Sequence, residues 1–207
     1  MEYYKVRSID EAVELLSELD DYHILAGGTD LVVDMRKGKK MPRNIVDLKG
    51  IKELSFIRKE DNFIEIGALT CMNDIADSDV LTSPYYGLKK AADIMGCYEI
   101  RNRATIGGNI VNARPSADTV VALYALEAEV VLISKEGRRQ VKIEDFIRGV
   151  GKVSLRKGEF LERILIPVCD EKSKSVFYRV QRTKGMDLAG INACIFYNNK
   201  EMRLNYS

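Results

Sequence analysis

Two glycine pairs, Gly27-Gly28 and Gly107-Gly108, constrain the fold of this chain more than any other feature of its sequence. The first pair follows the apolar run 24–26, which predicts a short buried strand, and precedes a predicted helix at 31–37. The second lies in a mixed stretch of glycines and β-branched residues at 104–112. Glycine adopts left-handed dihedrals that cost other residues about 1–2 kcal/mol, and its N–H can approach a ligand closely.

Two glycine loops that are far apart in sequence could close on one diphosphate from opposite sides. Backbone N–H groups at a helix start bind phosphate oxygens, whereas an isolated glycine pair usually forms a tight turn. Neither loop has the spacing G-x-G-x-x-G or G-x-x-x-x-G-K-[ST], so a Rossmann or P-loop site is not indicated. The residues alone leave the phosphate-binding and the tight-turn interpretations open.

The hydrophobic pattern predicts an α+β protein. Residues 1–53 predict strand, helix, strand, helix and strand, with a capping box at Ser8-x-x-Glu11. A polar turn between 54–58 and 63–69 is typical of an antiparallel hairpin. Beyond the hairpin, the pattern predicts helices at 70–76, 85–95 and 117–126, and strands at 128–133, 140–143 and 164–167.

The last part of the chain predicts strands without a covering helix. A polar linker at 169–175 precedes a strand at 176–181 and a hairpin of 188–197 with 202–206. Two or three strands make a poor independent unit. We therefore expect an incomplete third domain, or a sheet edge completed by another chain.

Composition excludes several classes of function. The 207 residues carry 32 Lys and Arg against 31 Asp and Glu, so charge gives no drive toward nucleic acid. No apolar run reaches the ~18–20 residues of a membrane helix, and the N-terminus lacks signal-peptide features. Four scattered cysteines and one histidine predict neither a disulfide framework nor a metal site. We expect a cytoplasmic protein with reduced thiols, no nucleic-acid partner and no membrane association.

Several motifs together resemble the FAD-binding subunits of molybdenum hydroxylases, a family that includes xanthine, nicotinate and carbon monoxide dehydrogenases. The motifs are 26–31 (AGGTDL), 105–110 (TIGGNI) and Ala113-x-Pro115-x-Ala117-Asp118. The run 100–104 and the late stretch Arg182-x-x-x-Met186-Asp187-Leu188-Ala189 add to this resemblance. It covers about residues 3–197, and its strength lies in the order and separation of the motifs.

The resemblance implies FAD held between two α+β subdomains, in a fold of the vanillyl-alcohol-oxidase (PCMH) type. The subdomains would be residues 1–53 and 54–168, and residues 169–207 would begin a C-terminal α+β domain. That domain is considerably longer in the family than residues 169–207.

The resemblance also implies which residues bind the cofactor. The first loop would wrap the diphosphate, the second would meet it, Asp118 would accept from a flavin-chain or ribose hydroxyl, and Arg179 would lie beside the flavin N1/O2 edge. The implied FAD-binding residues are Ile24, Leu25, Ala26, Gly27, Gly28, Thr29, Asp30, Leu31, Met95, Thr105, Ile106, Gly107, Gly108, Asn109, Asp118, Leu161 and Arg179. No residue of this chain is predicted to be catalytic or to bind a metal.

The implied function is that of an oxidoreductase subunit of the xanthine dehydrogenase type. Electrons would pass from a molybdopterin cofactor on a large subunit and [2Fe–2S] clusters on a small subunit, through FAD, to NAD⁺ or another acceptor. Two alternatives are a flavin-free nucleotide-binding or assembly module of the same fold and a standalone FAD-dependent reductase.

Overall fold

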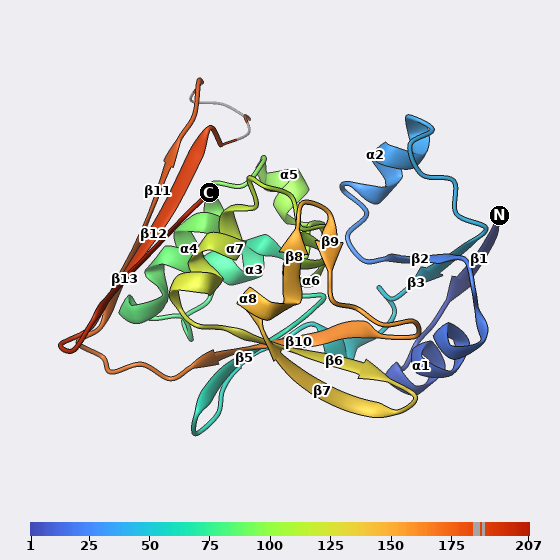
Figure 1. Cartoon of the computed structure of the whole chain (residues 1–207), viewed down its shortest axis with the longest axis horizontal. Helices are drawn as coiled ribbons and strands as arrows, with labels where there is room; N and C mark the ends of the chain where they lie inside the picture. Colours follow the sequence, from blue (N-terminus) through green and yellow to red (C-terminus); the bar gives the residue numbers. More distant parts are fainter. Residues whose placement is uncertain (184–186, 188) are drawn as a thin grey trace.

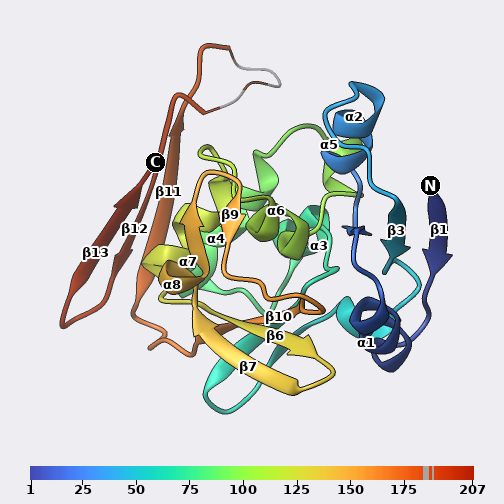
Figure 2. The ribbon, with the colours of Figure 1, turned by 45° about the vertical axis from the view of Figure 1, so that its right-hand side comes forward.

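The computed structural model describes residues 1–183, 187 and 189–207. A small N-terminal sheet and a C-terminal sheet lie at opposite ends of the molecule, with a group of helices and a larger sheet between them (Figure 1). Turning the molecule shows the same order (Figure 2). Mixed helix and strand content confirms the predicted α+β class.

The N-terminal layer is the predicted strand–helix–strand–helix–strand unit. Strands β1 (Glu2–Lys5), β2 (Tyr22–Leu25) and β3 (Asn44–Asp47) form a parallel sheet in the order β1-β3-β2. Helix α1 (Ile9–Glu18) begins after Ser8, whose hydroxyl accepts from the backbone N–H of Glu11 (3.1 Å) as the capping box predicts. Helix α2 (Leu31–Arg36) follows the first glycine loop.

The central layer is an antiparallel five-stranded sheet in the order β4-β5-β10-β6-β7. Its strands are β4 (Ile57–Lys59), β5 (Phe63–Gly67), β6 (Glu129–Ser134), β7 (Gly137–Lys142) and β10 (Phe160–Pro167). The helices that pack with it lie on one side (Figure 2): α3 (Met72–Asp77), α4 (Tyr86–Asp93), α6 (Ile106–Asn112) and α7 (Asp118–Ala125). The largest core cluster fills the space between this sheet and these helices. Shorter elements complete the layer: η1 (Lys52–Leu54), η2 (Ser83–Tyr85), α5 (Tyr98–Arg101), α8 (Ile143–Phe146), β8 (Ile147–Gly149) and β9 (Lys152–Val153).

The C-terminal sheet consists of β11 (Lys174–Val180), β12 (Ile191–Tyr197) and β13 (Met202–Tyr206), antiparallel in that order. Its inner side chains, including Phe177, Cys194 and Phe196, are buried. Its outer face exposes a row of large apolar side chains: Val176, Tyr178, Val180, Ile191, Ile195, Tyr197, Met202, Leu204 and Tyr206. The C-terminal sheet therefore has one covered face and one exposed apolar face, and its division from the rest of the chain stays a prediction.

The segments that differ from the sequence prediction include the second glycine loop and the start of the C-terminal sheet. The mixed stretch around the second glycine pair forms helix α6, and β11 begins at Lys174, inside the predicted linker. Tertiary contact explains the second difference, because the buried hydroxyl of Ser175 accepts from the backbone N–H of Gly87 (2.8 Å).

A buried ion pair fixes the end of the central sheet. The carboxylate of Glu159 accepts from Arg139 Nε (2.6 Å), from Arg139 Nη2 (2.7 Å) and from the backbone N–H of Arg156 (2.7 Å). Burial raises the pKa of Glu159, but these hydrogen bonds outweigh it and hold the pKa below its ordinary value of 4.5. Because the folded pKa lies below the unfolded one, this carboxylate stabilises the fold above about pH 4.5, and that stabilisation is lost as the pH falls through the folded pKa.

We expect Glu159→Gln to lower the free energy of unfolding by about 1–3 kcal/mol at neutral pH, because it leaves Arg139 without its charged partner. The difference from wild type should shrink as the pH falls below about 4.5, measured by urea unfolding at a series of pH values. Glu144→Gln is the control, since Glu144 forms only an exposed pair with Lys142 (3.8 Å). A difference that stays constant down to about pH 3 would contradict the assignment.

Candidate functional site

The two glycine loops touch. A Cβ built on Gly27 would lie 1.9 Å from the carbonyl oxygen of Arg103 and 3.1 Å from the Cα of Ala104. A Cβ built on Gly108 would lie 3.9 Å from the Cβ of Ala26. The loop that ends β2 and the loop that begins α6 thus meet at the junction of the N-terminal and central layers, as the diphosphate hypothesis requires.

The local environment differs at each glycine of the two pairs. Gly28 has φ +77°, a left-handed conformation that favours glycine. A Cβ on Gly27 or on Gly107 would collide with backbone, in the case of Gly107 with the carbonyl oxygen of Ala68 at 2.7 Å. Around Gly108 the nearest atom is the Thr105 hydroxyl at 3.0 Å. Gly108 is therefore the member of the second pair at which a Cβ would meet side-chain atoms and not backbone.

The backbone donors of the second loop are already used within the protein. Ile106 N donates to Thr70 O (3.1 Å) and Gly107 N donates to Ala68 O (2.9 Å). The N–H groups of Gly108 and Asn109 donate to the side chain (3.2 Å) and the carbonyl (3.0 Å) of Thr105. These four N–H groups are therefore already hydrogen-bonded within the protein, two of them to the segment 68–70, and the predicted contact of the second loop with the cofactor stays a prediction.

The backbone N–H groups of the first loop, in contrast, are not used within the described part of the protein. Within residues 1–183, 187 and 189–207, the N–H groups of Gly27, Gly28, Thr29 and Asp30 donate to no protein acceptor. Arg114 lies beside this loop, with Nη2 2.8 Å from Asp30 Oδ1. Of the two loops, the first therefore holds the backbone N–H groups that are available to an anionic ligand, and the second loop forms the wall opposite.

A chain of polar contacts links the second loop to two other predicted residues. Asn109 Oδ1 accepts from the hydroxyl of Thr119 (2.7 Å), and Asn109 Nδ2 lies 3.7 Å from the sulfur of Met95. Thr119 is the neighbour of Asp118 in the first turn of α7. Met95, Asn109 and the start of α7 therefore belong to one cluster.

Asp118 and Arg179 form a buried ion pair. Arg179 Nη1 donates to Asp118 Oδ2 at 2.8 Å, and the two side chains are 6% and 4% exposed. Asn192 Nδ2 donates to the other carboxylate oxygen at 3.0 Å, and Arg179 Nε donates to Gln181 Oε1 at 2.8 Å. The cation expected beside the flavin edge is thus paired with the carboxylate expected to bind a flavin hydroxyl.

Leu161 lies away from these polar contacts, in β10 opposite Leu132 of β6, and it is buried in the largest core cluster. Its predicted contact with flavin stays a prediction. In the late motif, Asp187 accepts from the backbone N–H of Arg182 (3.1 Å) and from its guanidinium (3.3 Å). Met186 and Leu188 lie outside the described residues.

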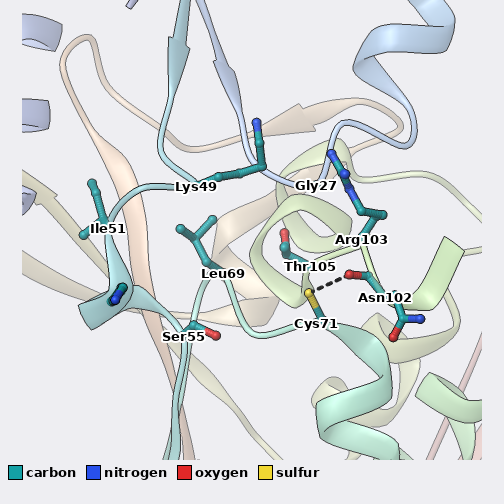
Figure 3. Close-up of a pocket in the computed structure, with 10 residues that line it drawn as sticks. Gly27, Lys49, Ile51, Ser55, Leu69, Cys71, Asn102, Arg103 and Thr105 are labelled. Atoms are coloured by element: carbon teal, nitrogen blue, oxygen red, sulfur yellow. Dashed lines mark hydrogen bonds between the residues drawn. The ribbon is translucent and has the colours of Figure 1, made fainter. Parts of the chain in front are cut away.

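A pocket of about 530 Å³ opens beside the loop contact (Figure 3). It is lined by Gly27, Lys49, Ile51, Lys52, Ser55, Leu69, Cys71, Asn102, Arg103 and Thr105. Burial raises the pKa of the Cys71 thiol, which donates to the carbonyl oxygen of Asn102 (3.3 Å). Lys49 is paired with the buried carboxylate of Asp47 (2.6 Å), while Lys52 and Arg103 add positive charge at the border that suits an anionic ligand.

Of these lining residues, the sequence prediction named Gly27 and Thr105 as cofactor-binding residues, and Asn102 and Arg103 lie in the run 100–104 that adds to the family resemblance. The sequence does contain one signal that indicates Lys49. Gly27 follows β2 and Lys49 follows the adjacent parallel strand β3, and ligands commonly bind at the carboxyl ends of parallel strands.

In the part of the chain that the structure describes, no helix is both long and apolar enough to cross a membrane. Nor does this part contain a group of three His, Cys, Asp or Glu side chains that could hold a metal ion.

Comparison with known proteins gives a family match. The model described as "FAD binding domain in molybdopterin dehydrogenase" matches residues 1–169. The nicotinate dehydrogenase FAD-subunit of Eubacterium barkeri is 36% identical over 195 residues, 92% of this chain and 66% of the relative. The glyceraldehyde dehydrogenase medium chain of Sulfolobus acidocaldarius is 36% identical over 183 residues, 88% of this chain and 65% of the relative.

Solved structures show the same similarity. A chain of carbon monoxide dehydrogenase from Hydrogenophaga pseudoflava superimposes with a TM-score of 0.95 at 30% identity, over 100% of this chain and 74% of that chain. The chain spans about two thirds of the length of the curated relatives that it matches.

Proposed function

The chain belongs to the family of FAD-binding domains of molybdopterin dehydrogenases, and on that premise we propose that it is the electron-transferring flavin subunit of a molybdenum hydroxylase. Its FAD would receive electrons from molybdenum and [2Fe–2S] centres on partner subunits and pass them to NAD⁺ or another acceptor. When bound, FAD supplies the redox chemistry, and the protein binds, orients and tunes it.

The contact between the two glycine loops carries this proposal. The unused N–H groups of Gly27, Gly28, Thr29 and Asp30 suit the oxygens of a diphosphate. The side-chain-free surface at Gly108 lets such a group lie close to the opposite wall. The residues present therefore fit a dinucleotide, with the first loop as donor and the second as a close boundary.

We propose a role at the same site for each of the other predicted residues. Ile24, Leu25, Ala26 and Leu31 would shape the first loop. Thr105, Ile106, Gly107 and Asn109 would shape the second. Asp118, Met95, Leu161 and Arg179 would border the flavin end, where the Asp118–Arg179 pair brings together one negative and one positive charge.

The proposed partners are a molybdopterin-binding large subunit and a [2Fe–2S] small subunit. Several relatives are named FAD-subunit or medium chain, which supports a chain that works beside others. We propose the cytoplasm as the compartment, where the four free cysteines would stay reduced. We also propose the division into residues 1–53, 54–168 and 169–207, with the loop contact between the first two.

Cofactor release and titration test the proposal. We expect the purified chain to release FAD on denaturation, identified by chromatography and absorbance, and the apo-protein to bind FAD at least about tenfold more tightly than ADP. Equal affinities for FAD and ADP would favour the flavin-free nucleotide module. Oxidation of NAD(P)H by the isolated chain on a small organic substrate would favour the standalone reductase.

A further inference from the structure

The Asp118 carboxylate is held by residues from outside the matched FAD-binding region. The family model ends at residue 169, whereas Arg179 lies in β11 and Asn192 lies in β12. Their donors reach the two carboxylate oxygens at 2.8 and 3.0 Å. The side chains of Arg179 and Asp118 are buried, and Asn192 is 0% exposed.

The geometry of Arg179 is fixed on two sides. Its Nη1 donates to Asp118, while Nε and Nη2 both donate to the amide oxygen of Gln181, just beyond the end of β11. A planar guanidinium with two partners has little freedom to rotate. The carboxylate is equally constrained, because each of its oxygens accepts a charge-assisted or amide hydrogen bond.

The held carboxylate lies next to the second glycine helix. Thr119 follows Asp118 directly, and its hydroxyl donates to Asn109 Oδ1 (2.7 Å) in α6. Any shift of the first turn of α7 therefore moves a hydrogen-bond partner of the loop that faces Gly27 and Gly28. Buried ion pairs contribute little net stability compared with apolar packing, so we infer an orienting role for this pair.

We propose that Arg179 and Asn192 are positioning residues of the cofactor site: they fix the Asp118 carboxylate, and with it the first turn of α7 against Asn109. The C-terminal sheet would then be a working part of the flavin site, although the FAD-binding family model does not reach it. This inference rests on the proposed function.

The test compares variants of the FAD-loaded chain by three measurements: the dissociation constant for FAD, the midpoint potential of the bound flavin, and the thermal unfolding midpoint of the apo-protein. Arg179→Met removes the cation, and Arg179→Lys keeps the charge without the planar guanidinium. Asn192→Leu removes the second hydrogen-bond donor to Asp118 without changing the charge. Arg203→Met is the matched control, because Arg203 joins the same sheet to Glu127 (2.6 Å) at the far end of α7.

We expect Arg179→Met to weaken FAD binding at least about tenfold and to shift the potential to a more negative value, because it leaves the Asp118 charge uncompensated. Arg179→Lys should restore most of the potential and part of the affinity. Asn192→Leu should weaken binding and leave the potential near wild type. Arg203→Met should change only the unfolding midpoint.

Two failures are distinguishable. Failure of the wild-type protein to bind FAD would contradict the proposed function itself. FAD binding and potential equal to wild type in Arg179→Met and Asn192→Leu, with a lowered unfolding midpoint, would overturn the positioning role alone. If Arg179→Met does not fold, Arg179→Lys and Asn192→Leu decide the outcome by the same measurements.

Discussion

Gly27→Ala is expected to open the junction between the N-terminal and central layers and to abolish FAD retention. The new Cβ would lie 1.9 Å from the carbonyl oxygen of Arg103 and 2.7 Å from its carbonyl carbon, whereas real Cβ contacts essentially never fall below 3.0 Å. Both colliding atoms are backbone, so no change of rotamer relieves the contact. One loop must move by about 1 Å, a displacement that overpacked sites resist at a cost of about 1–3 kcal/mol.

The measurements for this variant are the thermal unfolding midpoint and the FAD content per chain. Gly38→Ala is the control, because Gly38 has a left-handed φ of +67° and no atom within 4 Å of the built Cβ. It should lose about 1 kcal/mol through backbone strain and keep its FAD. Full FAD occupancy in Gly27→Ala would show that the loop contact is not needed for cofactor binding.

Gly108→Val is expected to weaken FAD binding by at least about 100-fold while the fold stays cooperative. Gly108 lies within α6 with an ordinary φ, and the atoms nearest a built Cβ are the Thr105 hydroxyl at 3.0 Å and the Cβ of Ala26 at 3.9 Å. The valine methyl groups would therefore enter the space between the two loops. Alanine in a helix is about 1 kcal/mol better than glycine, so Gly108→Ala should retain stability and show an intermediate loss of affinity.

Two control variants distinguish an effect on FAD binding from an effect on the stability of the fold. Gly107→Ala should destabilise the protein, because its Cβ would lie 2.7 Å from the carbonyl oxygen of Ala68. Gly149→Val should be nearly silent for flavin, because a Cβ built on Gly149 meets nothing within 4 Å beyond its chain neighbours. Unchanged FAD affinity in Gly108→Val would count against the second loop as a boundary of the ligand.

The sequence was sufficient to predict the family, the α+β FAD-binding fold and the convergence of the two glycine loops. Family membership and fold are confirmed by the match over residues 1–169 and by the superposition on carbon monoxide dehydrogenase. The order of the motifs made this possible, because each Gly-Gly pair alone is also typical of a simple turn. Electron transfer, the partners and the individual contacts with FAD stay predictions.

What the sequence could not supply depends on contacts between distant segments. Glycines disfavour a helix at 106–112, but the packing of Gly107 against Ala68 overrides that preference. The first two donors of the second loop are used by Thr70 and Ala68, which no local pattern connects to them. The ion pair of Asp118 with Arg179 likewise joins residues separated by 61 positions.

Amide hydrogen exchange with and without FAD tests the central claim most directly. If the first loop donates to the diphosphate, adding FAD should slow exchange at the amides of Gly27 through Asp30, which donate to no acceptor among the described residues. The amides of Ile106 through Asn109 should exchange slowly in both states, because they are already hydrogen-bonded. Stoichiometric FAD binding with unchanged exchange at residues 27–30 would contradict the account.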